Sequence, residues 1–125
     1  MLPDNYAVCR VSGNAASLAE IEPGQHGVVS VTRSAHEVSV ICPIDSAPAE
    51  AVVNTPWRCF RVAGPVDLAL TGILASLVNP LADARVNIFA FSTYDTDYVL
   101  VPSVRLTEAL AALEAAGHRI SSIEA

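Results

Sequence analysis

The sequence predicts an α+β protein made of two related units, each alternating strands with helices, with the first unit abbreviated. Three observations support this prediction. A strand-like segment recurs 51 residues later, a hairpin pattern closed by proline also recurs, and room for full helices exists only in the second half. We expect residues 1–55 and residues 56–125 to form the two units, packed or interleaved rather than joined by a linker.

The first unit opens with a strand over residues 6–13 that ends at a glycine turn. Its match is the segment over residues 57–64, and each segment has an aromatic residue first and then an arginine, a valine, a small residue and a glycine. Residues 28–43 are typical of a hairpin, with Pro43 at its end. Between these elements, residues 15–21 allow about two helical turns.

The first unit cannot complete the strand order of the second. From Gly13 to Pro43 there are 30 positions, whereas from Gly64 to Pro102 there are 38. Residues 45–55 hold at most a short helix and no fourth strand. We therefore expect the second half or another subunit to cover the exposed sheet edges of the first unit.

The second unit has a full helix after its first strand. Its apolar residues recur at helical spacing, and they are Val66, Leu70, Ile73, Leu74, Leu77 and Leu81. The start is open between two alternatives: Asp67 caps the helix, or residues 65–70 form a turn and Thr71 is the cap. Pro80 is expected to bend the helix or to break it near residues 78–79.

A second hairpin and a second helix follow. Residues 87–101 hold two β-branched and aromatic runs, separated by a tip rich in hydroxyl and carboxylate groups. A helix begins near Ser103, with an apolar face at Leu106, Ala109, Leu110 and Leu113, and stops at Gly117, which favours a left-handed cap. Residues 118–123 can add a last strand. The order is then βαββαβ, a ferredoxin-like unit.

The composition supports a folded core. Hydrophobic residues make up 52% of the 125 residues and charged residues 16%. Strand alternation and the two helix faces predict most of the core, namely Trp57, Cys59 or Phe60, Val62, Leu74, Leu77, Ile88, Phe89, Phe91, Val99, Val101, Leu110 and Leu113. No apolar run is long enough to span a bilayer and no basic leader precedes one, so we expect a cytoplasmic protein.

The charged residues exclude several functions. The net charge is −6, and the seven basic residues are all arginines spread along the chain, which disfavours nucleic-acid binding. The absence of lysine excludes a Schiff-base, P-loop or kinase-type lysine. An acidic protein is instead compatible with a cationic or zwitterionic ligand.

Catalytic, metal and cofactor patterns are also missing. Cys9, Cys42 and Cys59 lack CxxC spacing and are interpreted as small buried hydrophobes. The three histidines lack the i,i+4 spacing of a helical metal site. No GxSxG, HExxH or GxGxxG motif occurs. We expect no catalytic residue, no metal, no cofactor and no enzymatic activity.

Two segments of the second unit resemble a known family. Residues 64–77, which contain Thr71-Gly-Ile-Leu, precede the hairpin tip Ser92-Thr-Tyr-Asp-Thr-Asp97. Together they resemble the ACT-domain family of small-molecule sensors, most closely its CASTOR-like branch, and similar small bacterial proteins carry two ACT-like units. The resemblance covers residues 57–120 well and residues 27–43 more loosely.

The resemblance implies a function and a site. It implies a regulatory sensor that binds an amino acid or a similar zwitterion where the glycine turn of one unit meets a strand of a neighbouring unit. The matching positions are Gly72, Ile73, Thr93, Tyr94 and Asp97. Long eukaryotic members have four ACT units whereas this chain has two, so its site would form between its halves or between subunits.

Each site residue also has a plainer interpretation. Asp95 and Asp97 can simply accept backbone hydrogen bonds at a hairpin tip, and Asp95 is expected to be solvated. Gly72 can be a tolerated helix defect, although Thr71 before it favours a special backbone conformation at a helix start. Thr93 is a good strand residue in any case, while Tyr94 is expected at a surface.

Two functions therefore lead, and a small enzyme subunit is a third, weaker interpretation. The first is a non-enzymatic regulatory module in which a bound amino acid stabilises one arrangement of two units. The second is a structural or protein-interaction module without a ligand, which assembles through a sheet edge. Both are compatible with a homodimer or a higher homo-oligomer, which the incomplete first unit also predicts.

Overall fold

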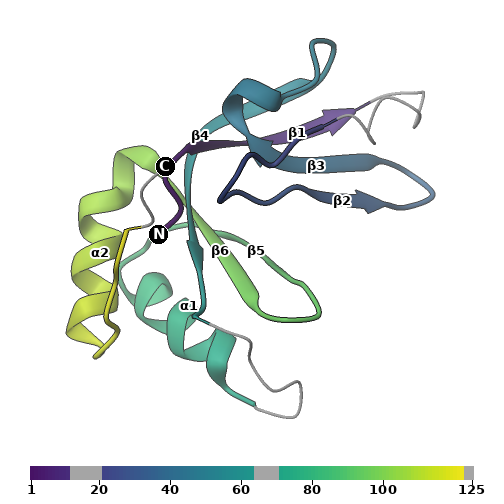
Figure 1. Ribbon diagram of the computed structural model, residues 1–125. Coiled ribbons are helices and arrows are strands. Elements are labelled where there is room, and N and C mark those ends of the chain that lie inside the picture. Colours follow the sequence, from purple (N-terminus) through teal and green to yellow (C-terminus); the bar gives the residue numbers. More distant parts are fainter. Residues whose placement is uncertain (12–20, 64–70, 123–125) are drawn as a thin grey trace.

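The computed structural model describes residues 1–11, 21–63 and 71–122 (Figure 1). The strands are β1 (Asn5–Val11), β2 (Ser30–Arg33), β3 (Val38–Pro43), β4 (Val52–Arg61), β5 (Phe89–Ser92) and β6 (Asp97–Pro102). The helices are α1 (Ile73–Asp83) and α2 (Leu106–Ala115), and the short 3₁₀ helices are η2 (Ile44–Ser46) and η3 (Ser103–Arg105). The architecture is α+β, as predicted.

The six strands form one curled antiparallel sheet in the order β2-β3-β1-β4-β6-β5. Figure 1 shows both helices on the same side of the β4–β6–β5 part of this sheet. The register shifts between Tyr6 and Val8, opposite residues 55–56 of β4. Pro56 lies at this irregularity, where its missing N–H costs no regular ladder hydrogen bond.

The strand register of the first half recurs in the second half. Tyr6 pairs with Pro43, and Trp57, 51 positions later, pairs with Pro102. Ser30 pairs with Ile41 in the first hairpin, and the residues 59 positions later, Phe89 and Leu100, pair in the second. A 3₁₀ helix follows each proline. The strand and hairpin echoes in the sequence thus correspond to matching strand pairs.

Two expectations about helices can be compared with the structure. The helix expected over residues 15–21, and the residues Val66, Asp67 and Leu70 of the next one, lie wholly or mostly outside the described residues. The described part of the first long helix begins at Ile73, with Gly72 as its N-cap. The second helix follows η3 at Ser103–Arg105, and it ends at a left-handed Gly117 as predicted.

Of the two effects expected at Pro80, a bend or a break, the break is wrong, because α1 continues through Pro80 to Asp83. A proline inside a helix leaves the carbonyl four residues earlier without its N–H partner. Here that carbonyl belongs to Ser76, and it accepts a hydrogen bond of 2.7 Å from Nε2 of His118. A side chain from outside the helix thus satisfies the group that Pro80 leaves open.

The last strand expected over residues 118–123 is also not formed in the described residues 118–122. β1 already pairs with β4 on the edge where such a strand would join. Further along that edge, the N–H of Leu2 donates to the carbonyl of Cys59 at 2.9 Å. The edge of β4 that the expected strand would join is therefore occupied by the beginning of the chain.

Three buried clusters form the core. The first cluster lies under the helices and centres on Phe60, Leu81, Val99, Val101, Ala109 and Leu113. The second lies on the opposite face of the sheet and centres on Leu2, Tyr6, Trp57, Cys59, Tyr98 and Leu100. The third consists of Ala7, Cys9, Val40 and Cys42. Leu74, Leu77, Ile88, Leu110 and Phe91 pack at their margins, and Val62 is half-buried. The prediction that Phe89 belongs to the core is wrong, because Phe89 lies on the edge strand and is 40% exposed.

The buried thiols predict a loss of stability at alkaline pH. Burial raises the pKa of Cys42 and of Cys59 to about 12, and it raises the pKa of Cys9 as well. An acid with a raised folded-state pKa stabilises the fold fully below its unfolded pKa, and this stabilisation is lost as the pH rises toward the folded value. Urea unfolding should therefore give a constant free energy from pH 7 to 8 and a falling one above pH 9. A rise above pH 9 would contradict the burial of these thiols.

Candidate functional site

Three of the five predicted site residues lie in the β5–β6 hairpin. The N–H of Thr93 donates to the carbonyl of Thr96 at 2.8 Å, so the tip is a tight turn. Tyr94 is 82% exposed at this tip. Asp97 is half-buried as the first residue of β6, and its Oδ1 accepts a hydrogen bond from the hydroxyl of Ser92. Asp95 is exposed, as predicted.

The base of this hairpin is bound to the end of β4. The hydroxyl of Thr96 is buried and donates to the carbonyl of Val62 at 2.7 Å. The N–H of Val62 donates in turn to the carbonyl of Asp97 at 3.0 Å. These reciprocal bonds fix the position of Asp97 relative to the segment that leaves β4.

The other two predicted residues, Gly72 and Ile73, form the start of α1. Gly72 has φ +80°, and a Cβ added to it would meet no atom within 4 Å. The predicted special backbone conformation at this position is confirmed. The first intrahelical bond runs from the N–H of Ser76 to the carbonyl of Gly72, and the N-cap makes no side-chain hydrogen bond. The N–H groups of the first turn carry partial positive charge suited to an anion.

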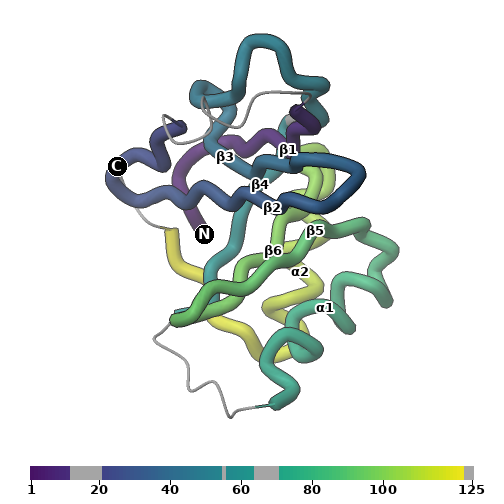
Figure 2. The backbone as a smooth tube through the Cα atoms, turned by 90° about the vertical axis from the view of Figure 1, so that its right-hand side faces the viewer, coloured from purple at the N-terminus to yellow at the C-terminus, as the bar shows by residue number. Residues whose placement is uncertain are grey.

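The hairpin tip and the start of α1 lie at the same end of the sheet (Figures 1 and 2). Val62 connects them: it is hydrogen-bonded to Thr96 and Asp97, and it lines the same cavity as Ile73. Residues 64–70, between Ala63 and Thr71, lie outside the described residues. No hydrogen bond joins Gly72 to the hairpin within the described residues.

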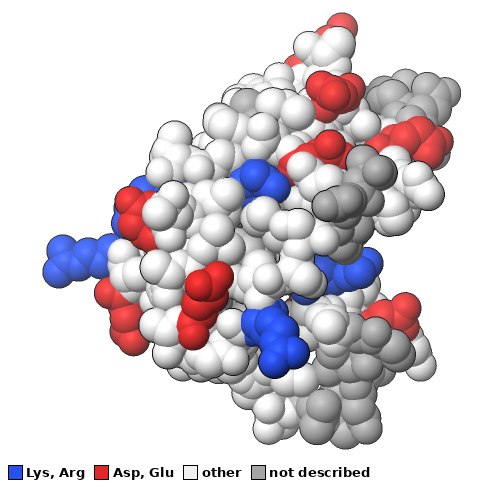
Figure 3. All heavy atoms as spheres, turned by 60° about the vertical axis from the view of Figure 1, so that its left-hand side comes forward, with Lys and Arg blue, Asp and Glu red and all other residues white. Residues whose placement is uncertain are grey.

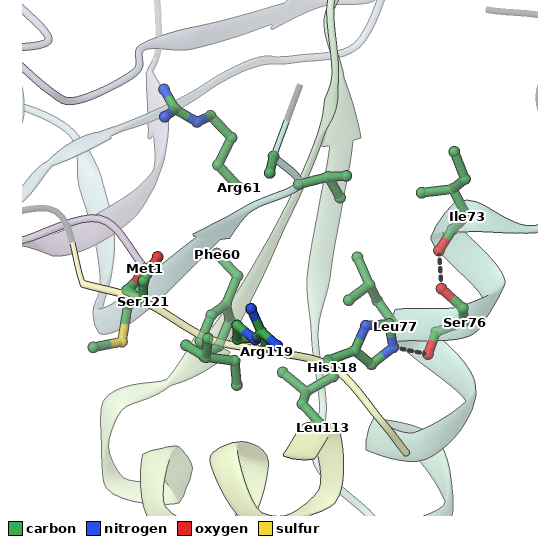
Figure 4. A pocket seen from close by; sticks show the side chains of 13 residues that line it. Met1, Phe60, Arg61, Ile73, Ser76, Leu77, Leu113, His118, Arg119 and Ser121 are labelled. Carbon is green, nitrogen blue, oxygen red and sulfur yellow. Dashed lines mark hydrogen bonds between the residues drawn. The ribbon is translucent and has the colours of Figure 1, made fainter. Parts of the chain in front are cut away.

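A cavity of about 280 Å³ lies between α1 and residues 118–121, and we call it the tail cavity (Figure 4). Phe60, Leu77 and Leu113 supply apolar walls. Figure 4 shows Phe60 and Arg119 on one side and Ile73, Ser76 and Leu77 on the other. Of the five predicted site residues only Ile73 lines it, so sequence reasoning missed the rest of its lining.

Two hydrogen bonds hold residues 118–121 at the edge of the tail cavity. His118 bonds to the Ser76 carbonyl freed by Pro80, and the Met1 amine donates to the carbonyl of Ser121. A carbonyl can only accept, so Nε2 of His118 is assigned as the donor. The spacing of Ser76 and Pro80 is the sequence signal for this contact, because it marks a carbonyl that needs a partner.

Other site types find no support within the described ranges. No three His, Cys, Asp or Glu side chains there lie close enough together to hold a metal ion. No described helix is both long and apolar enough to cross a bilayer. On the face in Figure 3, basic groups stand apart and alternate with acidic ones, unlike the basic stripe of a nucleic-acid interface.

Comparison with known proteins supports one family. The family model described as the ACT domain matches residues 52–115, which is more than half of the chain. Among proteins with curated functions, no relative matches the chain.

Solved structures give the same fold. The X-ray structure of protein Atu0741 from Agobacterium tumefaciens is 35% identical with a TM-score of 0.86, covering 99% of this chain and 91% of that one. Aspartate kinase from Clostridium acetobutylicum is 14% identical with a TM-score of 0.64, covering 90% of this chain and 32% of the kinase. A putative C-terminal regulatory domain of aspartate kinase from Porphyromonas gingivalis is 20% identical with a TM-score of 0.59, covering 93% and 94%.

Proposed function

The chain belongs to the ACT domain family, and on this premise we propose that it is a non-enzymatic sensor for an amino acid. ACT domains are regulatory modules that bind small molecules, and they often oligomerise. The proposed ligand lies at an interface between ACT units, where it favours one arrangement of those units over another. Membership in the CASTOR-like branch and a cytoplasmic location are part of the same proposal.

The carrying observation is that the hairpin bearing Asp97 is hydrogen-bonded to Val62, which lines the same cavity as Ile73 at the start of α1. The N–H groups of the first turn after Gly72 suit the carboxylate of an amino acid. Asp97, held by Ser92 and by the backbone of Val62, offers a countercharge to its ammonium group. A carboxylate acceptor and a helix start at one end of the sheet fit a zwitterion better than an ion of single charge.

The matching register supports the proposal of two ACT units per chain, residues 1–55 and residues 56–125. In this proposal the first unit is an abbreviated copy of the second. In the first hairpin, Ala35 and Val38 occupy the positions that correspond to Tyr94 and Asp97 in the second, 59 residues later. The first hairpin therefore has no carboxylate at the position that matches Asp97, although Glu37 precedes Val38. We propose one ligand per chain, bound with the second hairpin.

A thermal-shift panel of the twenty amino acids tests the proposal. Free ligand at a hundred times its dissociation constant adds about 2.7 kcal/mol to the free energy of unfolding. At least one amino acid should raise the melting temperature, and its decarboxylated analogue should not. If no amino acid does so, the alternative of a structural or protein-interaction module is favoured.

We further propose that the protein is a homodimer that pairs through β5. This edge strand, Phe-Ala-Phe-Ser, contains none of the charges or prolines that normally block edge pairing. β2, at the other edge, ends in Arg33. Sedimentation at micromolar concentration should show a dimer. Ala90→Pro, which removes an edge N–H, should shift it to monomer, while Val31→Pro on β2 should not. A wild-type monomer would contradict the proposal.

A further inference from the structure

The tail cavity combines an apolar interior with a cationic rim. Phe60 and Leu113 are 6% and 2% exposed, so the bottom of the cavity belongs to the core beneath the helices. Arg61 from the end of β4 and Arg119 from the tail also line it, and both side chains are exposed to solvent. A ligand could therefore bury an apolar body while its charged end stays at the rim.

The charge of this lining is unusual for the protein. Among the described residues that line it there is no Asp or Glu, although the sequence has 13 acidic residues against seven basic ones. Within residues 1–11, 21–63 and 71–122, neither Arg61 nor Arg119 forms an ion pair, whereas Arg105 pairs with Glu108. A guanidinium group binds carboxylates through parallel N–H donors, often two at a time.

The walls are held in place without using the arginines. The hydroxyl of Ser76 donates to the carbonyl of Ile73 at 2.6 Å, and the carbonyl of Ser76 is bonded to His118. The tail that carries Arg119 is thus attached to α1 next to the cavity. Ligand-binding groups on an attached segment lose less conformational freedom on binding than groups on a free chain end.

We propose that the tail cavity binds a small monocarboxylate with an aliphatic body, its carboxylate at the rim that Arg61 and Arg119 line. About 280 Å³ is close to the lower end of ligand pockets, roughly 300–1,000 Å³, so the ligand is smaller than a nucleotide cofactor. This site is separate from the proposed amino-acid site. It needs no ammonium partner, and the two share only Ile73 and Val62, whose backbone holds Asp97.

The test uses 4-methylpentanoate as the probe and 4-methylpentanamide, which has the same shape without the charge, as its control. Titration of the full chain, followed by NMR chemical shifts at low salt, should show saturable binding of the carboxylate and at least tenfold weaker binding of the amide. The double variant Arg61→Gln and Arg119→Gln should lower the affinity about tenfold to a hundredfold, as expected for charge-assisted hydrogen bonds.

Two control variants distinguish binding in the tail cavity from a general effect of charge and from binding at the hairpin. Arg10→Gln with Arg33→Gln changes the net charge equally at exposed arginines outside the cavity, and it should leave binding unchanged. Asp97→Ala should also leave the binding of 4-methylpentanoate unchanged. The outcome for the tail cavity is therefore independent of the outcome for the amino-acid site. Equal loss in both double variants, equal binding of the amide, or no binding of 4-methylpentanoate would each overturn the proposal.

Discussion

Replacing Leu81 by alanine is expected to lower the free energy of unfolding by about 2–5 kcal/mol. Leu81 is fully buried between α1 and the sheet, and its carbonyl accepts the N–H of Val86, which closes the end of the helix. Removing the side chain leaves a cavity beneath both helices, since neighbouring groups collapse only partly. Urea unfolding with an unchanged denaturant slope measures the effect.

Variants on α2 and η3 serve as comparisons for the loss of unfolding free energy in Leu81→Ala. Leu110 lies on the predicted helix face but is only half-buried at the cluster margin, so Leu110→Ala should cost less than Leu81→Ala. Val104 is 83% exposed, and Val104→Ala should change stability by at most about 0.5 kcal/mol. A loss below about 1 kcal/mol for Leu81→Ala would mean that α1 packs differently.

The second large effect concerns the binding of an amino acid. Asp97→Ala should weaken it by about tenfold to a hundredfold, because a hydrogen bond to a charged group is worth about 1.5–3 kcal/mol. Asp95→Ala, at the exposed tip of the same hairpin, is the matched control and should bind normally. Equal affinities of the two variants would show that the family's site does not include Asp97.

Gly72 requires a different test, because its φ of +80° strains any larger residue even though a Cβ has open space there. Gly72→Val should abolish binding by placing a branched side chain where the ligand's carboxylate approaches the backbone. Gly117→Val provides a control for backbone strain, since Gly117 has φ +95° at the far end of α2. Loss of binding in both would indicate destabilisation rather than a lost contact.

Local sequence patterns predicted most of the fold. The β5–β6 hairpin and the left-handed end of α2 at Gly117 depend on nearby residues, and both are observed. The errors arose from distant contacts. Pro80 does not break α1 because His118 satisfies the carbonyl of Ser76, and the tail adds no strand because β1 and Leu2 occupy the edge of β4.

The candidate site was only partly predictable for the same reason. The conformation of Gly72 and the exposure of Tyr94 follow from local sequence. That Val62 anchors Asp97 depends on the pairing of β4 with β6. The tail cavity depends on where residues 118–121 pack after α2 ends, and a pattern of strand alternation does not contain this information.

Calorimetric titration of the wild-type protein with the amino acid selected by the thermal-shift panel tests the central claim most directly. A regulatory ACT module with Asp97 in one hairpin and Val38 at the matching position of the other should show saturable binding of one ligand per chain. The titration should fail with the decarboxylated amine of the same amino acid. Absence of binding by all twenty amino acids at millimolar concentration, in a protein shown to be folded, would contradict an amino-acid sensor.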